Sequence, residues 1–234
     1  MKGAHALAAL AFISALTTAL GAAPLSHAAA GVRMTVAGDS LALGIGATDS
    51  SRGFAFDLFQ RVRAEHPASE VTNLAIGGAT TQDVVRLELP RIAVTHATVI
   101  LLEVGANDVV RRHPALGFAR DFHRLVEGIR RSTPGARIVL FNVPDVSVSP
   151  IFERPAKLPL HRLVLSYNTI IAGEGRRIEA PVVDLFAFSK RAATDTVRYF
   201  SADQFHPSDD GHAAIAAAAW PIVRALIARP LATK

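Results

Sequence analysis

Short apolar runs alternate along the chain with longer segments in which apolar positions recur at steps of three and four residues. The short runs predict buried β-strands, and the longer segments predict helices with one apolar face. The predicted strands cover residues 32–37, 70–75, 98–104, 137–142 and 182–185. The predicted helices cover residues 54–65, 80–95, 115–132, 160–178 and 208–228. Pro90 is expected to bend the second of these helices.

Strands that alternate with helices form right-handed crossovers, which give a five-stranded parallel sheet with helices on both faces. A chain of 234 residues fits one such domain better than two, so a three-layer α/β/α sandwich is expected over residues 31–234. Ligands of such sheets bind beyond the carboxyl ends of the strands. Polar clusters follow three predicted strands, at residues 38–40, 77–78 and 105–108. The irregular stretches 143–159 and 186–207 are expected to form the lips of a site there.

Residues 1–30 have the layout of a secretory signal peptide. Lys2 gives a positive start, residues 6–20 are almost all apolar, and an alanine-rich stretch follows. Cleavage is expected after Ala28 or Ala30, so that the mature protein is secreted or periplasmic. The alternative is an uncleaved membrane anchor, but the apolar run is shorter than the roughly 20 residues that a bilayer span needs.

The composition excludes several classes of function. The sequence has no cysteine, which rules out thiol catalysis and cysteine-ligated zinc. The net charge is +5, but the basic residues are dispersed and only two Tyr and one Trp are available to stack on bases, so nucleic-acid binding is disfavoured.

A serine ester hydrolase needs an exposed nucleophilic hydroxyl, an imidazole that accepts its proton, and a carboxylate that holds the imidazole. Ser40 follows the first predicted strand in the segment Gly-Asp-Ser-Leu. Asp203 and His206 stand three residues apart before the last predicted helix, a spacing that lets the carboxylate meet Nδ1 and leaves Nε2 for the serine. The alternatives are a helix-capping serine and a turn-capping aspartate beside a surface histidine.

The same chemistry needs donors that face the developing oxyanion. Asn107 follows the most apolar predicted strand and could offer its side-chain amide, while Gly78 could offer a backbone N–H where a side chain would crowd the substrate. The alternatives are an asparagine that forms a turn and a glycine that the backbone conformation requires.

Four segments together resemble the conserved blocks of the SGNH hydrolase superfamily, the GDSL esterases and lipases. They are GDSL, NLAIGGATT, GAND and DQFH, in the order of the family and over nearly the whole predicted mature chain. The resemblance implies Ser40 as nucleophile, Asp203 and His206 as its base system, and an oxyanion hole made by Ser40, Gly78 and Asn107. Gly77 departs from the serine that many relatives have there, so either glycine could be the donor.

The resemblance also implies a flavodoxin-like fold with strand order 2-1-3-4-5 and a reaction that needs no metal or cofactor. His206, Asp209, Asp210 and His212 could be drawn as a metal cluster, but no zinc-protease spacing occurs and this interpretation is disfavoured. The glycine-rich segments match neither a dinucleotide fingerprint nor a phosphate loop.

Four aromatic residues of the two irregular stretches are candidates for an acyl pocket, although core packing is the alternative for each. They are Phe152, Tyr199, Phe200 and Phe205.

The sequence therefore predicts an exported serine carboxylester hydrolase that acts on a small-molecule or lipid acyl ester through an acyl-enzyme. A lysophospholipase or thioesterase, a short-chain esterase and a carbohydrate O-acetyl esterase stay open as substrate classes. The alternative from another class is a catalytically silent binding domain of the cell envelope on the same scaffold. The sequence gives no oligomeric state.

Overall fold

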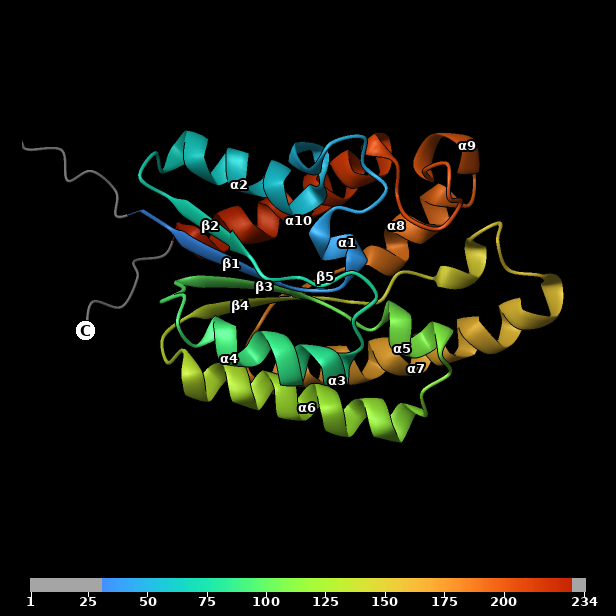
Figure 1. The fold of residues 1–234 in the computed structure, drawn as a ribbon, viewed down its shortest axis with the longest axis horizontal. Helices are drawn as coiled ribbons and strands as arrows, with labels where there is room; N and C mark the ends of the chain where they lie inside the picture. Colours follow the sequence, from blue (N-terminus) through green and yellow to red (C-terminus); the bar gives the residue numbers. More distant parts are fainter. Residues whose placement is uncertain (1–30, 229–234) are drawn as a thin grey trace, which may run out of the picture.

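The computed structural model describes residues 31–228, and its centre is a five-stranded parallel sheet (Figure 1). The strands are β1 (Arg33–Gly38), β2 (Glu70–Asn73), β3 (Val99–Glu103), β4 (Arg137–Phe141) and β5 (Val182–Val183). They lie in the order β2-β1-β3-β4-β5, which confirms the expected topology. The predicted leader, residues 1–30, lies outside the described residues.

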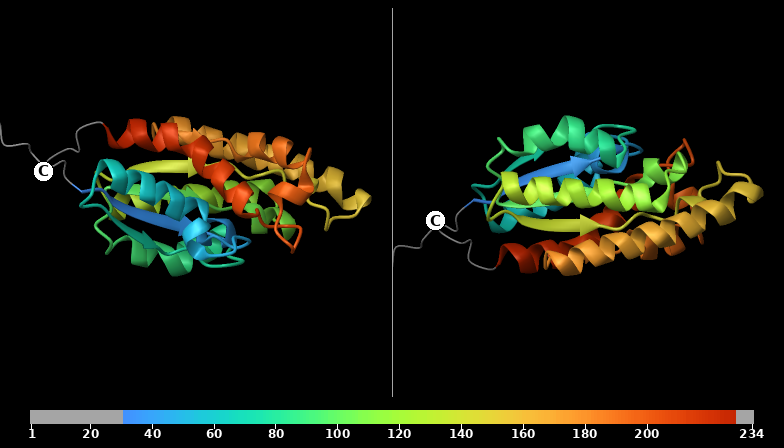
Figure 2. Two further views of the ribbon diagram at one scale, coloured as in Figure 1. Left: turned by 90° about the horizontal axis from the view of Figure 1, so that it is seen from above. Right: turned by 90° about the horizontal axis from the view of Figure 1, so that it is seen from below.

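Helices cover both faces of the sheet, as the views in Figure 2 show. One face carries α1 (Ser40–Leu43), α2 (Phe54–Glu65), α8 (Leu185–Ala192) and α10 (Asp209–Ile227). The other face carries α3 (Thr81–Asp83), α4 (Leu89–Ile92), α5 (Ala106–Val110), α6 (Ala115–Ser132) and α7 (Arg154–Arg177). A short helix, α9 (Thr196–Tyr199), packs beside α8. Within residues 31–228, no helix has the length and apolar character of a membrane span.

Strand β3 lies at the centre of the sheet and is buried along its whole length. Because side chains alternate along a strand, Ile100 and Leu102 enter the core on one face while Val99 and Leu101 enter the core on the other. The central strand therefore joins two apolar cores.

The helix that follows β2 is not simply bent at Pro90, as the sequence predicts. Between α3 and α4 it widens into a π-helical segment, Val84–Glu88. Proline has no N–H, and its ring clashes with the carbonyl one turn earlier, so a wider turn before Pro90 accommodates it. The wider turn places Glu88 in the interior, where its side chain is fully buried.

Three predicted boundaries after β4 are wrong. Helix α7 begins at Arg154 and not at Leu160, because Pro155 occupies the first turn, where a missing N–H costs little, and Pro159 is tolerated inside the helix. The stretch 186–207, predicted to be irregular, contains most of α8 and all of α9. Strand β5 has only two residues because Asp184 caps α8 by accepting from the Ala187 N–H.

Helices α6 and α7 are joined mainly by buried aromatic rings. The rings of Phe118 and Tyr167 stack with their centroids 3.7 Å apart. The Tyr167 hydroxyl donates to the backbone oxygen of His113 at 2.7 Å, so the buried phenol is paired. Both rings are fully buried, and packing of this kind dominates the stability of such an interface.

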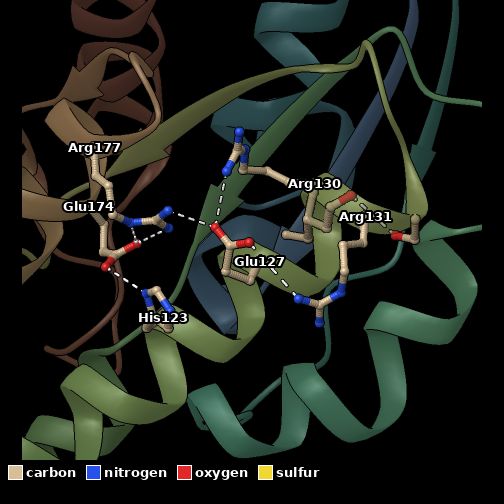
Figure 3. Close-up of polar contacts among 8 residues, drawn as sticks. His123, Glu127, Arg130, Arg131, Glu174 and Arg177 are labelled. Carbon is tan, nitrogen blue, oxygen red and sulfur yellow. Dashed lines mark hydrogen bonds and ion pairs between the residues drawn. The ribbon is translucent and has the colours of Figure 1, made fainter.

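A network of charged side chains joins the same two helices at the surface (Figure 3). Arg177 of α7 contacts Glu127 of α6 at 2.7 Å, and His123 of α6 contacts Glu174 of α7 at 3.0 Å. Exposed ion pairs contribute little to stability because water screens them. The network therefore adds little to the stability that the buried rings provide.

Candidate active site

The nucleophile candidate lies at a turn that only glycine permits. Strand β1 ends at Gly38, whose φ is 146°, and a Cβ there would come within 1.6 Å of the Glu103 backbone oxygen. Asp39 then caps α1 by accepting from the Leu41 N–H at 3.0 Å. Ser40 is the first residue of α1, and its backbone N–H donates no hydrogen bond within the described part of the chain.

The structure brings the three predicted triad residues together. His206 Nε2 lies 2.9 Å from Ser40 Oγ, although the two residues are 166 positions apart. His206 Nδ1 lies 2.6 Å from Asp203 Oδ2. With Nδ1–H donating to the carboxylate, Nε2 is left to accept the serine proton, which is the arrangement of a nucleophile, a general base and an orienting group.

The Asp203 carboxylate is held by its own loop. Its Oδ1 accepts from the backbone N–H groups of Phe205 at 2.8 Å and His206 at 2.9 Å, and from the Ser201 hydroxyl at 2.8 Å. Burial alone would raise the pKa of Asp203, but the hydrogen bonds from His206, the backbone and Ser201 outweigh burial and lower it. Asp203 therefore stays charged and fixed in orientation.

The two predicted lips contact each other beside this loop. Gln204 has a φ of 58°, a conformation that non-glycine residues rarely adopt. The hydroxyl of Ser149, which is only 1% exposed, donates to the Gln204 carbonyl at 2.7 Å. Ser149 of the stretch 143–159 thus holds the strained Gln204, which lies between Asp203 and His206.

Gly78 has free space in front of it. Its φ is 77°, and a Cβ at this position would meet no atom within 4 Å, so the space lies open to a substrate. Neither Gly77 nor Gly78 donates a backbone hydrogen bond to another described residue. The Gly78 carbonyl accepts from Arg111 Nη2 at 3.0 Å, a contact that fixes the peptide and that the sequence did not suggest.

The amide of Asn107 also lies beside the nucleophile turn. Its Nδ2 donates to Asp39 Oδ2 at 3.2 Å and to the Ala79 backbone oxygen at 3.1 Å. Both amide hydrogens thus have acceptors in the free protein. An oxyanion must share or displace one of these acceptors to bind Asn107.

Three buried carboxyl groups lie directly behind this turn, and none of them was among the candidate site residues that the sequence suggested. Burial raises the pKa of Asp39 to about 6 and that of Glu88 to about 7. Burial, and then the neighbouring Asp39 charge, also raises the pKa of Glu103 well above its ordinary value. The signal for Glu103 was an acid inside the predicted buried strand 98–104.

A small apolar cavity of about 50 Å³ opens beside Ser40 and His206. Phe200 and Phe205 line it, as the sequence suggested. Phe152 does not line the cavity but packs edge-on against Phe205, with ring centroids 6.1 Å apart.

The wall of this cavity also includes a residue that the sequence did not single out. Phe188 of α8 lines it, and Tyr199, another of the aromatic candidates, packs edge-on against Phe188 and not on the cavity.

The four residues considered as a metal cluster make separate contacts. His212 is buried in α10, where Nδ1 accepts from the Phe54 N–H at 3.2 Å and Nε2 donates to the Ile45 oxygen at 3.0 Å. Burial lowers the pKa of His212, so this histidine stays neutral. Asp209 and Asp210 are paired with arginines. Among the described residues, no group of three His, Cys, Asp or Glu side chains is placed to hold a metal ion.

The sequence pattern of the GDSL-like Lipase/Acylhydrolase family matches residues 36–214. No curated protein matches the chain in sequence.

Solved structures with the same fold cover most of the chain. One is a member of the lipolytic protein G-D-S-L family from Veillonella parvula (17% identity, TM-score 0.67, 82% of this chain and 98% of that chain). Another is the psychrotrophic esterase EstA from Pseudoalteromonas sp., inhibited by monoethylphosphonate (18% identity, TM-score 0.67, 85% of this chain and 100% of that chain). A third is a two-domain esterase (CEX) active on acetylated mannans (17% identity, TM-score 0.65, 88% of this chain and 53% of that chain). At these identities the likeness shows the fold.

Replacement of Asn107 tests whether its amide faces the reaction. Asn107→Ala is expected to lower kcat by about 10²- to 10³-fold with little change in KM, because an oxyanion donor acts only when charge develops. Asn142→Ala is the matched control: Asn142 also follows a strand, β4, but its amide donates to Asp184 and not to the nucleophile turn. If Asn107→Ala lowers only Tm and leaves kcat per folded molecule unchanged, as expected for the control, Asn107 is a turn residue.

Proposed function

The chain belongs to the GDSL-like Lipase/Acylhydrolase family, and from that premise we propose that this carboxylester hydrolase works through an acyl-enzyme on Ser40. The observation that carries the proposal is the unbroken chain of contacts from Ser40 Oγ through His206 to Asp203. Family membership also disfavours the alternative of a catalytically silent binding domain.

In the first half of the reaction, Ser40 Oγ attacks the acyl carbonyl while His206 Nε2 takes the hydroxyl proton. The backbone N–H groups of Ser40 and Gly78 and the amide of Asn107 stabilise the oxyanion of the tetrahedral intermediate. His206 then gives its proton to the leaving alkoxide or thiolate. The acyl group remains on Ser40 as an ester.

In the second half, His206 takes a proton from water, and the resulting hydroxide attacks the acyl-enzyme. The tetrahedral intermediate collapses, Ser40 recovers its proton from His206, and the carboxylic acid leaves. Asp203 keeps its charge throughout and stabilises the imidazolium in both halves, which its lowered pKa favours.

A fluorophosphonate probe tests the nucleophile directly. The mature protein is expected to take up one label, at Ser40, and Ser40→Ala should lose both the label and turnover of p-nitrophenyl acetate. Ser166→Ala, which removes an exposed hydroxyl on α7, should keep both. A label on another serine in the Ser40→Ala protein would remove Ser40 from its assigned role.

The cavity beside Ser40 favours a short acyl group. Its volume of about 50 Å³ is far below the roughly 300–1,000 Å³ of pockets that enclose larger ligands, and its wall is mostly apolar. Among the open substrate classes this favours a short-chain or O-acetyl esterase over a long-chain lipase. Of these two functions, the activity of the two-domain esterase on acetylated mannans supports a carbohydrate O-acetyl esterase.

Acyl chain length is therefore expected to control turnover. For p-nitrophenyl esters, kcat/KM should fall at least about tenfold from butyrate to octanoate, because a longer chain does not fit the cavity. Phe188→Ala enlarges the cavity and should restore octanoate turnover, whereas Phe56→Ala, which removes a ring on α2 remote from the cavity, should not. Equal turnover of both esters by the unaltered protein would contradict a short-acyl site.

We further propose that residues 1–30 are removed on export and that residues 31–234 form the mature domain. The positive start at Lys2 and the apolar run 6–20 support this.

Mass spectrometry of protein exported by a bacterial host should find the N-terminus at Ala29 or Gly31. Leu16→Arg, which places a charge in the apolar run, should keep the protein inside the cell. Membrane-bound protein that retains Met1 would instead indicate an anchor.

A further inference from the structure

Glu103 is an acid at the end of the most buried strand. It is the last residue of β3, it pairs in register with Gly38, and it is 1% exposed. Its backbone oxygen accepts from the Asp39 N–H at 3.2 Å. Its carboxyl group therefore lies against the turn that carries the nucleophile, yet the proposed reaction does not use it.

The Glu103 carboxyl contacts the Asp39 carboxyl and accepts from the Ala42 backbone N–H. Its Oε2 is buried, and no donor among the described residues reaches it. Neither carboxyl forms an ion pair with a described cation. Carboxylates only accept hydrogen bonds, so two of them in contact need one proton between them.

Asp39 connects this pair to the catalytic groups. Its Oδ1 accepts from the Leu41 N–H, which shapes the first turn of α1 next to Ser40. Its Oδ2 accepts from Asn107 Nδ2 at 3.2 Å. A shift of the Asp39 carboxylate would therefore move the Asn107 amide.

We propose that Glu103 is a positioning residue, which shares one proton with Asp39 and so fixes the carboxylate that orients the Asn107 amide. Glu103 touches no reacting atom and acts through Asp39. The kinetic part of this inference rests on the proposed role of Asn107 in the oxyanion hole. The shared proton does not depend on that role.

Other titratable groups face the pair. Glu88 lies on the π-helical segment, accepts from the Gly38 N–H at 2.8 Å, and is itself influenced by Arg91. The charges of Asp108 on α5 and His206 on the catalytic loop also act on Asp39. A test of Glu103 therefore keeps Glu88, Asp108 and His206 as they are.

A double-variant cycle tests the positioning role. Glu103→Leu should lower kcat about 10- to 100-fold with KM unchanged, because the Asn107 amide loses its orientation. In the Asn107→Ala background, Glu103→Leu should lower kcat no further, because two changes that act through one group are not additive. Losses that multiply would overturn the inference. Asp121→Leu, which removes a buried carboxylate remote from Ser40, is the control and should lower Tm without changing kcat per folded molecule.

Glu103→Gln tests the shared proton, also where Glu103→Leu fails to fold. Its amide donates permanently to Asp39 and should keep kcat within about threefold of the unaltered protein. The folded protein holds a proton that the unfolded chain releases above the ordinary Glu pKa of 4.5, so the contribution of this proton to stability is complete below that pH and is lost as pH rises through the raised pKa of the pair.

The dependence of Tm on pH should therefore be weaker in Glu103→Gln than in the unaltered protein. If Tm of Glu103→Gln depends on pH as strongly as Tm of the unaltered protein, or if its kcat is as low as that of Glu103→Leu, the inference is overturned. Failure of the proposed function is separable: turnover by Ser40→Ala would refute the acyl-enzyme and leave the Tm comparison intact.

Discussion

The hydrogen bond between Ser40 Oγ and His206 Nε2 is the contact on which the site depends, and it joins opposite ends of the domain. His206 lies just before α10, so the bond forms only when α10 docks correctly on the sheet. His212 stabilises that docking through two hydrogen bonds. Its ring donates to the Ile45 oxygen and accepts from the Phe54 N–H, at the two ends of the segment that follows α1. A buried neutral histidine thus supports the placement of the catalytic one.

Much of the fold follows from local sequence patterns. The parallel sheet and the two helical layers were predictable because most strands are short apolar runs and each long helix has one apolar face, whereas the strand order followed from the resemblance to the SGNH hydrolases. The errors occur at prolines and caps. A π-helical segment and not a bend precedes Pro90, α7 begins before Pro159 and not after it, and Asp184 caps a helix where a strand was expected. At these positions the local effects of proline and of the helix cap set the boundaries, and hydrophobic periodicity does not show them.

The triad was predictable for a topological reason. Polar clusters at the carboxyl ends of parallel strands must meet at one edge of the sheet, and the turn spacing of Asp203 and His206 fixes their mutual contact. The segments around the site were predictable, but the contacts between them were not, because a contact such as that of Ser149 with Gln204 depends on packing between distant segments. An acid within an apolar strand, Glu103, was the one overlooked sign of the carboxyl groups behind the nucleophile.

In the proposed mechanism, the backbone N–H groups of Ser40 and Gly78 and the amide of Asn107 surround a single oxyanion position. A crystal structure of the mature protein with a phosphonate bonded to Ser40 Oγ measures this directly. We expect a phosphoryl oxygen about 2.7–3.1 Å from the N–H nitrogens of Ser40 and Gly78 and from Asn107 Nδ2. A phosphoryl oxygen out of reach of Gly78, with the Asn107 amide still bonded to Ala79 and Asp39, would contradict it.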